Sequence, residues 1–87
     1  MTKPCRLELN NSGAWKLLGL FDAADDNVSD NVLTASASLA EALNAASGSD
    51  RAAVTLRVST NETQPVVLMR WQSADLGWRD PVTGEPR

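Results

Sequence analysis

Histidine is absent from the 87-residue chain, and cysteine occurs once, as Cys5. A lone cysteine cannot close an internal disulfide, and without imidazole the chain cannot form the Ser–His or Cys–His pairs that activate most nucleophiles. The same two shortages exclude zinc, copper and haem sites built from thiolate and imidazole ligands within one copy. We therefore expect no cofactor and no metal, and we predict that the protein is not an enzyme.

The standard nucleotide-binding loops and long apolar segments are also missing. The five glycines are scattered and form neither G-x-x-x-x-G-K-[ST] nor G-x-G-x-x-G. No apolar run approaches the roughly 20 residues that span a bilayer, and the residues that follow Met1 lack the apolar segment of a signal peptide. We expect a cytoplasmic protein without a membrane segment.

Acidic and basic residues are unevenly distributed along the chain, whose net charge is −3. Residues 17–50 contain six acidic residues and no basic one, whereas the last 37 residues contain five arginines. A protein that binds duplex nucleic acid through its phosphates normally has a dense basic stripe, which this sequence lacks. Nucleic acid is therefore not the expected partner.

Hydrophobic periodicity predicts four strands and one helix. The segments with the pattern of strands are residues 5–10, 14–21, 51–60 and 66–72. Residues 28–47 instead repeat apolar side chains at the helical period. The order ββαββ predicts one α+β domain over residues 1–79, with a four-stranded, mainly antiparallel sheet and one long helix packed on one face. Residues 80–87 have no apolar pattern and are predicted to form a flexible C-terminal tail.

The predicted helix has two sides of different character. The side expected to face the sheet carries a stripe of Val28, Val32, Ala35, Leu39, Ala42, Leu43 and Ala46. Leu33, Ala37 and Ala40 are then expected to face solvent. Small side chains let another backbone come close, so these three residues are candidates for contact with a partner or a second copy. The alternative is that alanine is present as a good helix former.

Three aspartates, Asp22, Asp25 and Asp26, lie just before or at the start of the predicted helix. Carboxylates there cap the helix and interact favourably with its dipole, so a solvated capping loop is one interpretation. The same cluster could contact a basic partner, or hold a divalent cation weakly, although no D-x-[DN]-x-[DN]-G loop is present.

The three tryptophans lie in or directly after predicted strands, and two adjoin arginine, in Arg70-Trp71 and Trp78-Arg79. Tryptophan and arginine are common at binding hot spots, which makes Arg70, Trp78 and Arg79 candidates for partner binding. Trp15 and Trp71 are candidates for the core as well as for an interface, and the sequence leaves both open. Alternation assigns to one face of the second strand Trp15, Leu17, Gly19 and Phe21.

These features favour a small non-catalytic protein-binding module that regulates or inhibits a larger protein by occupying its surface. In size and character the chain resembles small accessory proteins of phages and mobile elements, anti-CRISPR proteins among them. No motif carries this resemblance, and it implies no functional residue. Two alternatives stay open: a self-associating structural protein, a homodimer included, and a binder of single-stranded nucleic acid through arginine and tryptophan of the last strand.

Overall fold

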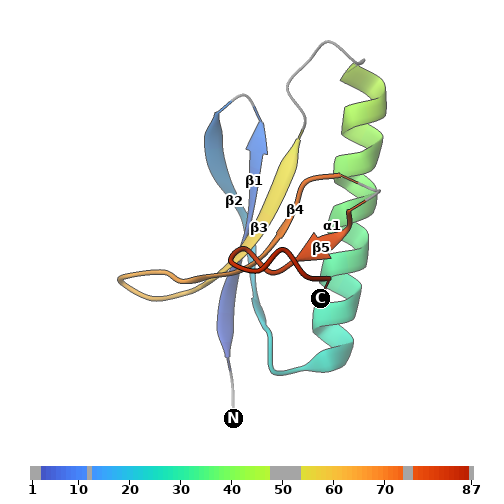
Figure 1. Ribbon diagram of the computed structural model, residues 1–87. Coiled ribbons are helices and arrows are strands. Elements are labelled where there is room, and N and C mark those ends of the chain that lie inside the picture. Colours follow the sequence, from blue (N-terminus) through green and yellow to red (C-terminus); the bar gives the residue numbers. More distant parts are fainter. Residues whose placement is uncertain (1–2, 12, 48–53, 74–75, 87) are drawn as a thin grey trace.

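Figure 1 shows the computed structural model of the protein, which describes residues 3–11, 13–47, 54–73 and 76–86. The elements along the chain are β1 (Pro4–Asn11), β2 (Ala14–Asp22), α1 (Asp26–Ser47), β3 (Thr55–Thr60), β4 (Val67–Trp71) and β5 (Trp78–Arg79). This order confirms the predicted α+β fold and adds the two-residue strand β5 to the four strands that were predicted. Of the predicted third strand, residues 51–53 lie outside the described part of the chain.

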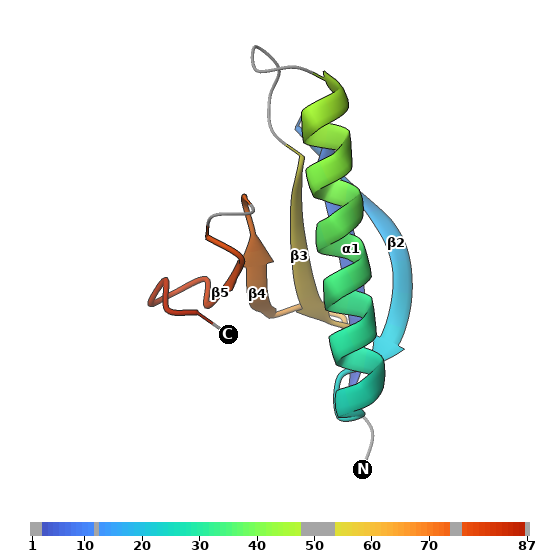
Figure 2. The ribbon, with the colours of Figure 1, turned by 90° about the vertical axis from the view of Figure 1, so that its right-hand side faces the viewer.

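The strands form one antiparallel sheet in the order β2-β1-β3-β4-β5, so that β2 and β5 are the edges. The β1–β2 turn is closed by Asn10, whose Oδ1 accepts a hydrogen bond from Gly13 N at 2.9 Å. Gly13 has φ of +95°, a conformation that glycine adopts without steric cost. α1 connects β2 to β3 and lies against one face of the sheet (Figure 2). The other face is covered by no described helix.

β2 contains a bulge in its pairing with β1. Leu7 lies opposite Gly19, but the next residue, Glu8, lies opposite Leu17. Leu18 is therefore an extra residue with no directly opposed partner. An extra residue reverses the alternation of side chains beyond it.

Because of the bulge, the four β2 residues that were predicted to share one face of the sheet lie on two different faces. Phe21 lies opposite Cys5, whose side chain is in the core beneath α1, whereas Trp15 lies opposite Asn10. Gly19 and Phe21 thus belong to the face beneath α1, and Trp15 and Leu17 to the uncovered face. The prediction of a common face is wrong because the sequence pattern assumed strict alternation.

The core lies between α1 and the sheet and consists of two clusters, with Trp78 packed against both. Its buried hydrophobic residues are Cys5, Leu7, Leu9, Ala40, Val54, Leu56, Val58 and Trp71. Trp71 is only 2% exposed and therefore belongs to the core, one of the two alternatives open from the sequence.

α1 is rotated about its axis relative to the prediction. Ala40 is 0% exposed, and Leu33 and Ala37 are partly buried against the core, so the expectation that these residues face solvent is wrong. Leu39 and Leu43, which were expected to face the sheet, are 49% and 40% exposed. Other members of the predicted stripe that are exposed are Val28, Ala35, Ala42 and Ala46, whereas Val32 is partly buried.

Two polar anchors account for this rotation. Trp78 Nε1 donates a hydrogen bond to Leu33 O at 3.1 Å. Near the other end of the helix, Asn44 Oδ1 accepts from Val54 N at 2.6 Å and Asn44 Nδ2 donates to Val54 O at 3.3 Å. Ala40 lies between these anchors, where its small side chain allows α1 to approach the sheet. The buried side is therefore set by hydrogen bonds and a small contact residue, which a hydrophobic stripe does not reveal.

The C-terminal segment, residues 80–86, folds into turns beside β5 (Figure 1). Asp80 N donates to Glu85 O at 2.8 Å, and Gly84 N donates to Asp80 O at 2.9 Å. These backbone hydrogen bonds organise a segment that was predicted to be a flexible tail. Such bonds require no apolar pattern, and the flexibility predicted for this segment stays a prediction.

Candidate functional site

The uncovered face of the sheet, opposite α1, carries a row of charged side chains across four strands. Arg57 of β3 lies directly opposite both Glu8 of β1 and Arg70 of β4. Arg70 in turn lies directly opposite Arg79 of β5. Directly opposed residues of antiparallel strands share a face, with Cβ atoms about 4.5–5.5 Å apart. The strand register thus gathers three arginines side by side.

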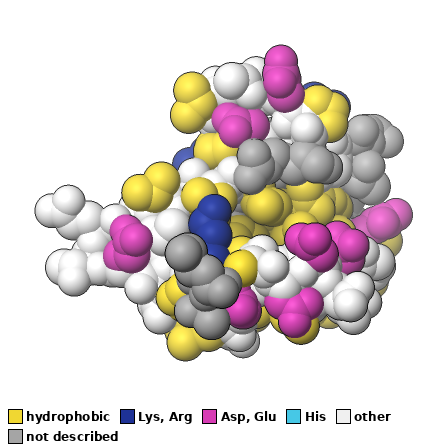
Figure 3. Space-filling view, turned by 90° about the horizontal axis from the view of Figure 1, so that it is seen from below, with side chains coloured by type: hydrophobic (Ala, Val, Ile, Leu, Met, Phe, Trp, Pro, Cys, Tyr) yellow, Lys and Arg dark blue, Asp and Glu magenta, His cyan; other side chains and the backbone are white. Residues whose placement is uncertain are grey.

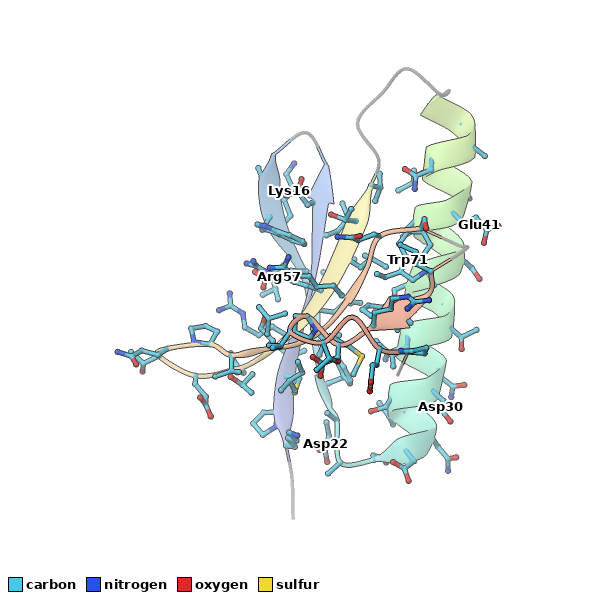
Figure 4. All side chains as sticks on the ribbon, in the orientation of Figure 1. Lys16, Asp22, Asp30, Glu41, Arg57 and Trp71 are labelled. Carbon is cyan, nitrogen blue, oxygen red and sulfur yellow. The ribbon has the colours of Figure 1, made fainter. Side chains whose placement is uncertain are left out.

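Arg57 is held by two partners from neighbouring strands. Its Nε donates to Glu8 Oε1 at 2.9 Å, in an ion pair whose side chains are 24% and 10% exposed for Arg57 and Glu8 respectively. The guanidinium carbon lies 4.1 Å from the centroid of the Trp15 ring, in a cation–π contact. Figure 4 shows Arg57 on the side of the sheet away from α1 and Trp71 on the side that faces it. Trp15 therefore belongs to the uncovered face and not to the core.

Aliphatic side chains adjoin the charged row at the β2 edge. Leu17 lies opposite Glu8 and Leu20 lies opposite Arg6. The two leucines are 51% and 59% exposed, although the solvated face of an antiparallel sheet usually carries polar side chains. Arg6 contributes a further cation, whose Nε is buried without a hydrogen-bond partner among the residues that the structure describes.

Arg79 and Arg70, at the other end of the row, differ in their partners. Arg79 Nε donates to Leu76 O at 2.8 Å, and Arg79 Nη1 donates to Gly84 O at 2.8 Å. These neutral acceptors orient the guanidinium without offsetting its charge. Arg70 is exposed, and within the described ranges no hydrogen bond or ion pair engages its guanidinium. The β4–β5 end of the face therefore carries two arginines that form no ion pair within the described ranges.

Asp22, a predicted partner contact, has local structural partners. Its Oδ1 accepts hydrogen bonds from Lys3 N at 2.8 Å and Ala24 N at 2.9 Å. These two bonds favour the charged form and lower the pKa of the Asp22 carboxyl. The carboxylate therefore stabilises the turn that leads from β2 into α1.

Asp25 caps α1, since its Oδ1 accepts from Val28 N at 3.2 Å. Asp26 is exposed in the first helical turn. Acidic side chains gather at this end of the molecule in Figure 3. The structure thus supplies a turn-stabilising role for Asp22 and a helix-capping role for Asp25. Contact of the three aspartates with a partner stays a prediction.

The ring of neither tryptophan in the last two strands is fully exposed to solvent. Trp71 is buried, and Trp78 is partly buried with its Nε1 bonded to α1. Trp71 therefore offers no surface on which a nucleic-acid base could stack, and the Trp78 ring is partly covered. Binding of single-stranded nucleic acid, one predicted alternative, stays a prediction. Of the predicted arginine and tryptophan candidates, the structure brings Arg70 and Arg79 together on the uncovered face, while Trp78 points to the other side.

Cys5 is fully buried, and desolvation by burial raises the pKa of its thiol, as for an unreactive core cysteine. In the described ranges, no group of three or more cysteine, aspartate and glutamate side chains is arranged to hold a metal ion. Nor does any described helix combine the length and apolar character needed to cross a membrane.

No protein-family model, curated protein or solved structure matches the chain. The chemistry of the uncovered face therefore follows from its own side chains. Its leucines offer apolar contact area, and its arginines offer positive charge and planar N–H donors suited to carboxylates. Such a face can bind a surface that is both apolar and acidic.

From the sequence, Arg70 and Arg79 were candidates for partner binding and Trp15 was open between core and interface, but the ion pair of Glu8 with Arg57 was not predicted. Alternation in residues 5–10 and 51–60 already separates a polar face from an apolar one. Alternation does not show the register in which two strands pair. Glu8 lies beside an arginine of β3 only because β1 and β3, which are far apart in the chain, pair in this register. The signal for the bulge that turns Trp15 outward is Gly19 beside it, because an isolated glycine within a strand often marks a bulge.

Proposed function

We propose that the protein is a binding module for another protein, and that its contact surface is the uncovered face of the sheet. One observation carries the proposal: Leu17 and Leu20 are about half exposed on this face, beside a row of arginines. Arginine and tryptophan are enriched at interface hot spots, and the exposed leucines beside them add apolar contact area of the kind found at the centre of an interface.

The partner surface that fits this face has an apolar centre and acidic neighbours. Leu17 and Leu20 would supply the apolar contact at the β2 edge. Arg57 already has a carboxylate partner in Glu8, so the cations that remain for partner carboxylates are Arg6, Arg70 and Arg79. Opposite charges across such an interface mainly set specificity and the rate of encounter. The role of a regulator or inhibitor that occupies a larger protein's surface rests on the small size and composition of the chain.

Leucine substitutions on opposite sides of the molecule test this proposal. Leu17→Asp with Leu20→Asp places charge on the uncovered face, whereas Leu39→Asp places it on the exposed flank of α1, at a similar exposure of 49%. We expect a protein captured by wild type to be captured by Leu39→Asp but lost with the double variant. Titration calorimetry with that purified protein should then give the same order of affinities. Equal binding by all three forms would exclude the uncovered face.

Self-association is a second candidate, favoured by the exposed flank of α1. Val28, Leu39 and Leu43 lie on this flank and are 38%, 49% and 40% exposed. Light scattering coupled to size-exclusion chromatography measures the mass directly. A dimer that Leu39→Asp dissociates and Leu17→Asp leaves intact would support this candidate, and a monomer at high micromolar concentration would eliminate it.

A further inference from the structure

A pocket of about 170 Å³ lies between β4, β5 and the C-terminal segment. Its lining includes Arg70 from β4, Arg79 from β5, and Gln72, Asp80 and Gly84. It lies at the β5 side of the sheet, away from the β2 leucines at the other edge. The volume is below the roughly 300–1,000 Å³ of pockets for drug-sized ligands, so it suits a compact chemical group.

The two arginines of the pocket are directly opposed on neighbouring strands. Like charges in this position repel each other, and a sheet normally avoids the arrangement or neutralises it. Arg79 is oriented by the carbonyl groups of Leu76 and Gly84, both at 2.8 Å, which leave its charge in place. Arg70 lacks a hydrogen-bond or ion-pair partner in the described part of the chain. The pocket thus holds two close cations, one of which is oriented in advance.

Asp80 is the acidic residue of the pocket lining, and it has partners of its own. Its Oδ1 accepts hydrogen bonds from Val82 N at 2.8 Å and Thr83 N at 3.0 Å. Together with the two arginines, it leaves the pocket lining with a formal charge of 2 − 1 = +1. One positive charge and several N–H donors match an anion with planar or tetrahedral oxygens, because guanidinium binds carboxylate and phosphate oxygens in pairs.

We infer that this pocket is a binding site for a small oxyanion, a carboxylate or phosphate group, which Arg70 and Arg79 hold between them. The bound anion would relieve the repulsion of the two guanidinium groups while Gln72 offers a further polar contact. This inference does not rest on the proposed protein-binding function, since it requires neither Leu17 nor Leu20.

The test compares anions at constant ionic strength. Melting temperatures are measured with increasing sodium phosphate or sodium acetate, each balanced by sodium chloride. We expect a saturable rise with at least one of the two anions over chloride, and the anion that gives the tighter response identifies the preferred oxyanion. Backbone amide shifts on titration should change most at Gly77 and Gly84, which line the pocket.

Arg70→Gln is the decisive variant, and Lys16→Gln is its matched control. Both side chains are exposed, but Lys16 lies on β2, outside the pocket. Loss of a charge-assisted hydrogen bond should weaken anion binding about tenfold or more in Arg70→Gln and leave Lys16→Gln unchanged. Amide shifts that occur elsewhere, an equal response of Arg70→Gln and wild type, or no response beyond that of chloride would each overturn the inference. Folding of Arg70→Gln is checked independently by its amide spectrum without anion.

Discussion

Replacing Glu8 by glutamine removes the carboxylate from the charged row while keeping the shape of the side chain. Arg57 then remains above Trp15, with Arg70 opposite it and no carboxylate from Glu8. Breaking an exposed ion pair costs about 0.2–1 kcal/mol, and removing one partner of a buried pair costs about 3–5 kcal/mol. The side chains of Glu8 and Arg57 are 10% and 24% exposed, so we expect an intermediate loss of about 1–3 kcal/mol in the free energy of unfolding.

Urea denaturation of wild type, Glu8→Gln, Arg57→Gln and the double variant measures this loss as a double-mutant cycle. The cycle should give a coupling energy of about 1–2 kcal/mol, and low salt should enlarge the loss in Glu8→Gln. Adding Arg70→Gln to Glu8→Gln should restore about 0.2–0.5 kcal/mol, since it removes a like charge opposite Arg57. A loss below about 0.3 kcal/mol in Glu8→Gln, with no coupling to Arg57, would refute the row as an interacting unit.

Three further predictions concern α1, the turn before it and the buried thiol. Ala40→Leu should overpack the fully buried contact of α1 and lower the free energy of unfolding by about 1–3 kcal/mol. Leu39→Ala, at an exposed position, should change the free energy of unfolding by less than about 0.5 kcal/mol. Similar losses in both variants would contradict the observed rotation of the helix. The pKa of Asp22 is lower in the folded protein, so its contribution to stability is present above the unfolded pKa of about 3.9 and is lost as pH falls through the folded pKa. Between pH 5 and pH 2, the free energy of unfolding should therefore fall less steeply in Asp22→Asn than in wild type. Identical slopes in the two proteins would disprove the contribution of the Asp22 carboxylate to stability. Cys5 should resist a thiol reagent at pH 8 until urea unfolds the chain, and rapid labelling of the native protein would contradict its burial.

The strands and the helix could be predicted because each carries its own local pattern. Alternation in residues 5–10 and the helical repeat in residues 28–47 depend only on near neighbours in the chain, and the elements follow them. The buried side of α1 could not be predicted in this way. It depends on Trp78 reaching Leu33 O, and their positions are set by packing between segments 45 residues apart.

The candidate site was predictable only in part, for the same physical reason. Arg70 and Arg79 were identified by composition, since each adjoins a tryptophan in the sequence. Their direct opposition depends on the register of β4 and β5, and the place of Arg57 in the row depends on the register of β3. Register is a property of paired strands and has no marker within either strand alone.

The bulge at Leu18 in β2 affects the tendency of the protein to aggregate. A long apolar edge strand offers unpaired N–H and C=O groups to which another chain can add, and fibres grow by repeating that step. β2 has nine residues, with Leu17, Leu18 and Leu20 exposed. The bulge at Leu18 interrupts the regular spacing of the edge groups, so an added strand could follow β2 for only four residues on either side. The chain can therefore expose apolar side chains to solvent, while the bulge opposes the edge-to-edge strand pairing that would lead to polymers.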